Sequence, residues 1–190
     1  MELLLGCGHR REKLMGLPGS NLKWDKLVTL DIVGAVKPDI LCDLMQIPWA
    51  PIVTNTVGER CIDKNSGLFK GSYFDEIHAY EVMEHLGAQG DYKIFFAQFR
   101  EIFRMLKPGG HFFATVPSRF SPWLWGDPGH TRVSYQESFS FMSQKIIAAN
   151  RKANTPMSDY SEVWPPVYDF EIVASTDTHT VHSFCLRAIK

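Results

Sequence analysis

Short apolar runs, each followed by glycine, proline or an acidic residue, divide the first 120 residues of the chain. Runs of about four to eight apolar residues bounded in this way are typical of strands buried in a parallel sheet. Five segments fit this description: residues 1–5, 26–31, 39–44, 74–80 and 111–117. The pattern favours an α/β fold built on an open sheet.

Helical periodicity is clearest just before the last of these runs. Asp91 is the expected N-cap, and from there apolar residues recur with the spacing of one helix face. These residues are Tyr92, Phe95, Phe96, Phe99, Ile102, Phe103 and Leu106. Residues 107–110 contain a proline and two glycines, so we expect the helix to end there.

A second helix signal and a hairpin signal follow. Residues 134–137 fit a capping box and predict a helix that continues to about residue 149. Two β-like runs, residues 168–174 and 179–189, flank polar residues 175–178. We therefore expect the chain to end in an antiparallel hairpin.

Three segments lack clear periodicity. Residues 9–25 contain two glycines and a proline, which predict a loop-like first crossover. Residues 50–72 are expected to form a loop or an inserted element. Residues 118–133 are rich in Pro, Gly and Trp and predict a structured loop.

Composition narrows the class of protein. The 190 residues, 45% hydrophobic and 22% charged, suit one globular domain over residues 1–190. A formal net charge of −1 indicates no general attraction to nucleic acid or anionic membranes. No run approaches the roughly 20 apolar residues of a membrane span, and no signal region precedes the first strand, so we expect a cytoplasmic protein.

The four cysteines, at positions 7, 42, 61 and 185, form no C-x-x-C pair and have no closely spaced histidine partner. Disulfide frameworks and zinc sites of the usual spacing need such patterns. We therefore expect buried free thiols and no metal site.

The first apolar run ends directly in a glycine turn. Gly6 and Gly8 flank Cys7, and nucleotide-like cofactors bind at such turns because residues without side chains let the ligand approach the backbone. The second run ends in Asp31, about 25 residues after Gly6. An acidic residue near this spacing accepts hydrogen bonds from ribose hydroxyls. The two signals together indicate a ligand of the adenosine type.

Several motifs resemble, in the right order, those of one enzyme family. They are Leu4-Leu5-Gly6-Cys7-Gly8, Asp31, Asp43 with Pro48-Trp49, Phe74-Asp75 leading to Glu81-Val82-Met83-Glu84-His85-Leu86, and Leu106-Lys107-Pro108-Gly109-Gly110. Together they look like the class I S-adenosylmethionine-dependent methyltransferases, most closely the small methyltransferase type 11 kind, over residues 3–117. The resemblance implies a doubly wound, mostly parallel, seven-stranded sheet with helices on both faces and a C-terminal antiparallel hairpin.

The resemblance also implies where S-adenosylmethionine binds. The expected cofactor-binding residues are Gly6, Gly8, Asp31, Asp43, Leu44 and Glu81. In such proteins the glycines hold the methionyl part, the first acid binds the ribose, and the second acid and the leucine lie at the adenine. Glu81 follows the fourth strand, where the family places residues near the methionine end and the substrate.

Two departures from the family pattern bear on this site. Leu4 stands where the family often has an acidic residue, and the third glycine is replaced within residues 8–11. The second departure counts against a nicotinamide-binding domain, whose G-x-G-x-x-G needs that glycine for helix packing. The family's helices before the first strand are not found here, so we expect residues 50–72, residues 118–133 or a second subunit to cover one side of the pocket.

Methyl transfer from a sulfonium needs alignment of nucleophile, methyl group and sulfur, and a base where the nucleophile carries a proton. His130 and His85 are the candidate catalytic bases, because both follow strands at their carboxyl ends, where ligands bind in open α/β sheets. A structural hydrogen-bonding role stays open for each.

The expected methyl acceptor is an oxygen or nitrogen of a small molecule. Arg119, Arg132 and the aromatics around Trp123 suit an anionic or sugar-bearing acceptor, and residues 118–166 are expected to form a loop and helix insertion on the substrate side. RNA and protein acceptors stay open. DNA bases are disfavoured, because residues 79–82 read Ala-Tyr-Glu-Val where DNA amine methyltransferases have an Asn/Asp-Pro-Pro-aromatic motif.

Two other functions stay open. A non-catalytic methyltransferase-like module, acting with a partner subunit, would bind little or no cofactor. A homodimer stays open for the protein in either case. A nicotinamide-dependent oxidoreductase would bind NAD instead.

Overall fold

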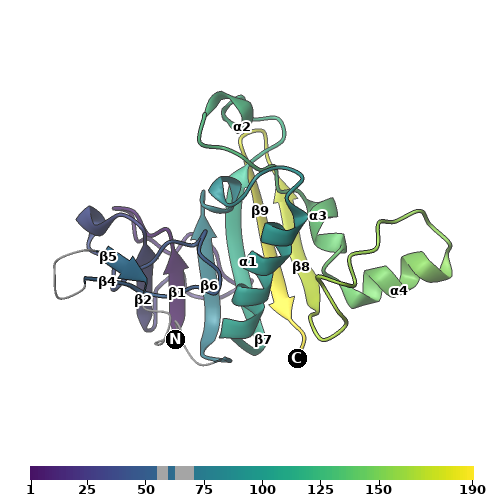
Figure 1. Ribbon diagram of the computed structural model, residues 1–190, viewed down its shortest axis with the longest axis horizontal. Helices are drawn as coiled ribbons and strands as arrows, with labels where there is room; N and C mark the ends of the chain where they lie inside the picture. The colour runs from purple at the N-terminus through teal and green to yellow at the C-terminus, as the bar shows by residue number, and fades with distance from the viewer. Residues whose placement is uncertain (55–59, 63–70) are drawn as a thin grey trace.

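The computed structural model describes residues 1–54, 60–62 and 71–190, which contain a seven-stranded sheet of order β3-β2-β1-β6-β7-β9-β8 (Figure 1). The strands are β1 (Glu2–Leu5), β2 (Leu27–Asp31), β3 (Ile40–Leu41), β6 (Phe74–Tyr80), β7 (Leu106–Pro117), β8 (Phe170–Asp177) and β9 (Val181–Ala188). β1 is parallel to β2 and β6, β2 to β3, and β6 to β7, whereas β9 is antiparallel to β7 and β8. A mostly parallel sheet with a terminal antiparallel hairpin is therefore confirmed.

The carboxyl ends of β1, β2, β6 and β7 meet at one edge of the sheet, the upper edge in Figure 1. Three segments gather there. They are the glycine turn after β1, the 3₁₀ helix η2 (Met83–His85) after β6, and residues 118–133 after β7, which include α2 (Trp123–Gly126). Ligands of open α/β sheets bind at this edge.

One face of the sheet is covered by α1 (Tyr92–Met105), the helix expected from the apolar periodicity. Asp91 is its N-cap, as predicted, and its carboxylate accepts a hydrogen bond from the Ile94 N–H at 3.1 Å. The Phe99 side chain, 1% exposed, lies at the centre of the core between α1 and the sheet. Its ring contacts those of Phe95, Phe112, Phe139 and Phe170.

The single helix expected over residues 134–149 is wrong. Two short helices are found there, α3 (Gln136–Ser140) and α4 (Gln144–Lys152), and the N-cap of α3 makes no side-chain capping hydrogen bond. The Gln144 N–H, at the start of α4, donates to Asp169 Oδ1 at 2.8 Å. The carboxylate of Asp169, which directly precedes β8, therefore accepts a hydrogen bond from a backbone N–H at the start of α4. Because this partner is distant in the chain, the local sequence around α4 does not reveal it.

Two segments that the sequence predicts as turns form parts of strands in the structure. Residues 107–110 follow the end of α1 as expected, but they form a part of β7 with an irregular register to β6, in which Gly109 has φ of 75°. Residues 175–177 continue β8, and the hairpin turns after Thr178 instead. Residues 175–177 pair with β9, which extends the strand into polar sequence. Residues 107–110 lie between two paired positions of β7, Leu106 and His111, where the register to β6 shifts.

A separate two-stranded antiparallel sheet pairs β4 (Ile52–Thr54) with β5 (Arg60–Ile62). It lies in the segment 50–72, for which a loop or inserted element is expected. Residues 55–59 and 63–70 of that segment lie outside the described residues.

Cys7, Cys42 and Cys185 are buried free thiols, which confirms the prediction for these three. The Cys61 side chain lies outside the described part of the chain. None of the helices that the structure describes has the length and apolar character needed to cross a membrane.

Beside β1 and β6, the other face of the sheet is covered by residues 9–25, which form no helix. Lys13, 7% exposed, anchors this segment, because its Nζ lies 2.6 Å from Glu2 Oε1 and 2.5 Å from Glu76 Oε2. The Tyr80 hydroxyl accepts hydrogen bonds from two backbone N–H groups of the segment. The loop-like first crossover is confirmed, whereas helical cover of both faces is wrong for this part of the sheet.

This buried network predicts that acid destabilises the fold. His78 Nε2 donates to Glu76 Oε2 at 2.9 Å, and its Nδ1 accepts from the Tyr80 hydroxyl at 2.7 Å, so the ring is neutral. The hydrogen bonds from His78 and Lys13 lower the pKa of Glu76 to about 2, and burial lowers the pKa of His78. Both groups take up protons more readily in the unfolded chain. We therefore expect stability to fall as the pH drops below about 6.5, and further below about 4.5.

Urea unfolding between about pH 7 and pH 3 measures this dependence. The Glu76→Gln variant should show a shallower loss below about pH 4.5, whereas Glu162→Gln, a change at an exposed position, should behave as the wild type. A free energy of unfolding that does not change over this range would contradict the prediction.

Candidate functional site

The glycine turn is tied to β2 by a buried carboxylate. Gly6 and Gly8 both have positive φ, 56° and 51°. The Gly8 N–H donates to Asp31 Oδ2 at 2.9 Å, and the Val33 N–H donates to Asp31 Oδ1 at 2.8 Å. These two hydrogen bonds hold the turn and the end of β2 in one geometry. Asp31 is only 7% exposed.

Gly6 also allows a close approach between neighbouring loops. A Cβ atom at this position would lie 2.5 Å from Val82 Cγ2, in the segment after β6. At Gly8, by contrast, a Cβ atom would meet nothing within 4 Å. The first glycine is therefore needed for both backbone conformation and space, and the second for conformation alone.

The predicted cofactor residues line two cavities that share Gly6 and Glu81. A cavity of about 340 Å³ is lined by Gly6, Asp31, Asp43, Leu44 and Glu81 among others. A cavity of about 530 Å³ shares Gly6 and Glu81 with it and includes Gly8. All six residues thus lie at the carboxyl edge of the sheet, within volumes that suit a small-molecule ligand.

The loop after β3 is anchored to α1. The Leu44 carbonyl accepts hydrogen bonds from Trp49 Nε1 at 3.0 Å and Gln98 Nε2 at 2.7 Å. Asp43 Oδ1 accepts from the Met45 N–H at 2.8 Å. These contacts hold the loop that carries Asp43 and Leu44, which line the same cavity as Asp31 at the end of β2.

A second group of side chains lies beside this cavity, on η2 and on residues 118–133. His85 Nε2 is 4.0 Å from Glu84 Oε1, and His130 Nε2 is 3.9 Å from the same oxygen. The two imidazole rings pack edge to face, with centroids 4.8 Å apart. The predicted bases His85 and His130 are therefore neighbours, and they share the buried carboxylate of Glu84.

Residues 118–133 are held in this place by Arg132. Arg132 is 8% exposed, and its guanidinium donates hydrogen bonds to the backbone carbonyls of Leu86, Ala88 and Asp91. The backbone N–H of Arg132 donates to the Glu84 carbonyl at 3.1 Å. Arg132 therefore has a structural role in this loop, whereas its binding of an acceptor stays a prediction.

Other candidate acceptor residues remain accessible. Trp123 and Trp125 are 69% and 75% exposed, so neither belongs to the core. The Arg119 guanidinium lies 3.6 Å from Asp177 and stacks near the rings of Phe120 and Tyr135.

Glu84 is 1% exposed, and neither carboxylate oxygen has a hydrogen-bond partner within the described part of the chain. Burial raises the pKa of Glu84 to about 8, and the charges of Glu81 and Asp127 act in the same direction. A buried carboxylate without partners is costly for a fold, so such groups are common at functional sites.

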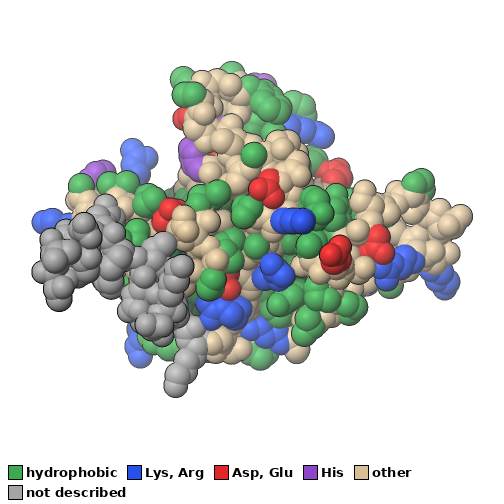
Figure 2. Space-filling model, in the orientation of Figure 1, with side chains coloured by type: hydrophobic (Ala, Val, Ile, Leu, Met, Phe, Trp, Pro, Cys, Tyr) green, Lys and Arg blue, Asp and Glu red, His purple; other side chains and the backbone are tan. Residues whose placement is uncertain are grey.

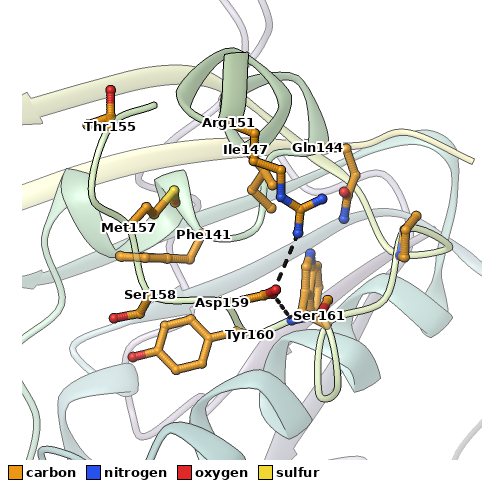
Figure 3. A pocket seen from close by; sticks show the side chains of 12 residues that line it. Phe141, Gln144, Ile147, Arg151, Thr155, Met157, Ser158, Asp159, Tyr160 and Ser161 are labelled. Carbon is orange, nitrogen blue, oxygen red and sulfur yellow. Dashed lines mark hydrogen bonds and ion pairs between the residues drawn. The ribbon is translucent and has the colours of Figure 1, made fainter. Parts of the chain in front are cut away.

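A further cavity lies away from this edge, between α4 and the segment that follows it (Figure 3). It has a volume of about 90 Å³, and the exposed ion pair between Arg151 and Asp159, at 3.5 Å, crosses it. The cavity has neither a glycine turn nor a strand-end acid, so it is not the expected cofactor site.

Comparisons with known proteins identify the fold of the chain. Neither the protein-family models nor the curated proteins contain a match to the chain. Solved structures match over its whole length at low identity. The N-methyltransferase NodS from Bradyrhizobium japonicum WM9, in complex with S-adenosyl-L-homocysteine, has a TM-score of 0.51 at 15% identity, covering 100% of this chain and 78% of that one. The chain has the class I methyltransferase fold.

Two further structures with this fold show its range. A SAM-dependent methyltransferase from Archaeoglobus fulgidus has a TM-score of 0.53 at 11% identity, covering 98% of this chain and 85% of that one. The CurJ carbon methyltransferase has a TM-score of 0.54 at 12% identity, covering 100% of this chain and 48% of that one. The names include nitrogen and carbon methyltransferases, so the fold does not determine the acceptor atom.

Sequence reasoning missed Glu84 as a site residue. The available signal was its place beside His85 directly after the fourth strand, at an edge where ligands bind. Its burial and its contact with a histidine from a distant loop are tertiary features that no local pattern shows.

Proposed function

We propose that the protein is an S-adenosylmethionine-dependent methyltransferase. The observation that carries the proposal is the pair of cavities sharing Gly6 and Glu81, around which the glycine turn, two strand-end aspartates and a buried leucine lie at the carboxyl edge of this fold. We expect the glycine turn to bind the methionyl part of the cofactor, the first aspartate to bind the ribose, and the second aspartate and the leucine to lie at the adenine.

The residues fit the cofactor in chemistry and in available hydrogen-bonding capacity. Each Asp31 oxygen accepts one backbone N–H, which leaves lone pairs for the ribose hydroxyls. The Asp43 Oδ1 atom is used by Met45, so its second oxygen is the acceptor for the adenine amine. Leu44, 7% exposed, supplies an apolar surface for the ring.

When bound, S-adenosylmethionine supplies a methyl group that its sulfonium sulfur has already activated for displacement. The chain then has to orient the acceptor and receive or release its proton. His85 and His130 are the proposed residues for this task, because His85 lines the cofactor cavity and the His130 ring packs against the His85 ring.

The proposed acceptor is an oxygen or nitrogen of a small molecule, bound on the side of residues 118–166. The exposed Trp123 and Trp125 offer stacking surfaces there. On the face seen in Figure 2, acidic and basic side chains are interspersed, which favours a small acceptor over a nucleic acid.

Thermal unfolding with S-adenosylmethionine, S-adenosylhomocysteine and NAD in parallel tests the proposal. A ligand at one hundred times its dissociation constant stabilises by about 2.7 kcal/mol, a shift of several degrees for a domain of this size. We expect a shift with the two adenosyl-sulfur compounds and none with NAD.

The Asp31→Ala variant should lose about 1.5–3 kcal/mol of binding free energy, since hydrogen bonds to a charged acceptor are removed.

The controls distinguish loss of binding from general damage. Asp25→Ala changes an exposed carboxylate outside the cavity and should keep the full shift. A shift with NAD alone would replace the proposal with an oxidoreductase. Absence of any shift would favour a non-catalytic module.

A further inference from the structure

Three ligand-type atoms converge beside the cofactor cavity, and neither carboxylate oxygen among the group has a hydrogen-bond partner in the described residues. The three atoms belong to Glu84, His85 and His130, and one ligand atom of each lies within 4.8 Å of the others. Glu84 Oε1 is 4.0 Å from His85 Nε2 and 3.9 Å from His130 Nε2. Two come from the segment after β6 and one from the segment after β7, so two adjacent strand ends bring them together.

The hydrogen bonds of the imidazoles determine which nitrogen carries the lone pair. His85 Nδ1 lies 2.9 Å from the Gly129 carbonyl, and His130 Nδ1 lies 2.9 Å from the Trp123 carbonyl. A carbonyl oxygen can only accept, so each Nδ1 is the protonated donor. In the neutral rings both Nε2 atoms therefore carry lone pairs and face the carboxylate.

This arrangement is the one that metal-binding histidines use. A histidine ligand almost always donates its other ring N–H to a carbonyl or carboxylate, which fixes both its tautomer and its orientation. Here both histidines satisfy that condition through backbone carbonyls of the same loop, residues 123–129. The loop is itself held by Arg132, so the orientation does not depend on the histidines alone.

The charge at the site also calls for a cation. Glu84 is 1% exposed and its two oxygens have no hydrogen-bond partner within the described residues. Asp127 adds a second carboxylate, with Oδ2 at 3.8 Å from His130 Nε2. Three lone-pair atoms this close together, one of them on a buried carboxylate, are stabilised when a positive charge, a proton or a bound cation, lies between them.

We infer that Glu84, His85 and His130 bind a divalent transition-metal ion. Two imidazole nitrogens and one carboxylate suit Zn²⁺, Mn²⁺, Fe²⁺ or Co²⁺ better than Mg²⁺ or Ca²⁺, which prefer oxygen ligands. Two ligands that share an ion at about 2.1 Å lie about 3.4 Å apart in a tetrahedral site, so binding draws the three side chains inward by small rotations.

Three protein ligands leave a coordination position open. Because His85 also lines the cofactor cavity, an oxygen of the methyl acceptor is the ligand we expect there. This step rests on the proposed function, whereas the metal site itself does not. With the ion bound, the Nε2 lone pairs of His85 and His130 are used as ligands, so the two histidines act on the acceptor's proton through the ion rather than as bases themselves.

Isothermal titration of untagged protein, first freed of metal with EDTA, tests the site with Zn²⁺, Mn²⁺ and Co²⁺ as probes and without any cofactor. We expect one ion per chain for at least one of these metals, and a visible d–d absorption band with Co²⁺. His85→Ala and His130→Ala should each weaken binding by about 10-fold or more, since loss of an outer-shell partner already costs about 10–100-fold. Glu84→Gln should do the same.

His179→Ala is the matched control, because His179 is exposed in the turn between β8 and β9 and should leave binding unchanged. Circular dichroism confirms that each variant is folded, and the two exposed or partly exposed histidine positions keep the test valid if the Glu84 variant fails to fold. The inference is overturned if the wild type binds none of the three ions, or if the His85 and His130 variants bind as tightly as the control. Thermal shift with S-adenosylmethionine is a separate measurement, so failure of the metal site and failure of the proposed function can be told apart.

Discussion

Replacement of Gly6 with alanine is expected to prevent binding of S-adenosylmethionine and to destabilise the fold by about 2–5 kcal/mol. The left-handed conformation at φ of 56° costs about 1–2 kcal/mol for a residue with a Cβ atom. The new methyl group would also lie 2.5 Å from Val82 Cγ2, and such overpacking costs typically about 1–3 kcal/mol. The segment after β6 has to move away, and Glu81 and Val82, which both line the cavity, move with it.

Gly8→Ala is the matched control for this prediction. Its φ of 51° carries a similar conformational cost, but the added methyl group meets nothing within 4 Å. We therefore expect a loss of about 1–2 kcal/mol and a smaller loss of affinity. Urea unfolding and calorimetric titration with the cofactor measure both quantities. Equal behaviour of the two variants would mean that the contact with Val82 does not matter.

Replacement of His130 with alanine is expected to lower turnover by about 100-fold or more, the range for loss of a group that acts on the acceptor's proton. Affinity for S-adenosylmethionine should stay unchanged, because His130 is not among the residues that line the cofactor cavity. The measurement is the rate of methyl transfer to an acceptor found by screening small oxygen and nitrogen nucleophiles, together with calorimetric titration of the cofactor.

The exposed His179 again gives the control, since His179→Ala should retain full turnover. A structural role of His130 would appear as a lower melting temperature and weaker acceptor binding, with kcat preserved. Full turnover by His130→Ala would exclude His130 from the chemistry. Restoration of rate by added metal ion in the wild type, but not in the variant, would connect this prediction to the proposed metal site.

Much of the fold is visible in short stretches of sequence. The strand Phe74–Tyr80 and the N-cap Asp91 lie where the apolar pattern and capping chemistry predict them. The glycine turn and Asp31 are also predictable, because a positive φ and a strand-end carboxylate each depend on one residue and its immediate neighbours. Local preference and periodicity act over a few residues, so they can be interpreted without knowledge of the rest of the chain.

Other features depend on residues that meet only in the folded chain. The break between α3 and α4 is accompanied by a hydrogen bond from Gln144 to Asp169, and the loop on the second face of the sheet is held by Lys13 between acids of β1 and β6. The group of Glu84, His85 and His130 has the same origin. These side chains come together because β6 and β7 are adjacent and parallel, which places the segments after both strands at one edge. Strand order is a property of the whole sheet, and no window of sequence along either strand contains it.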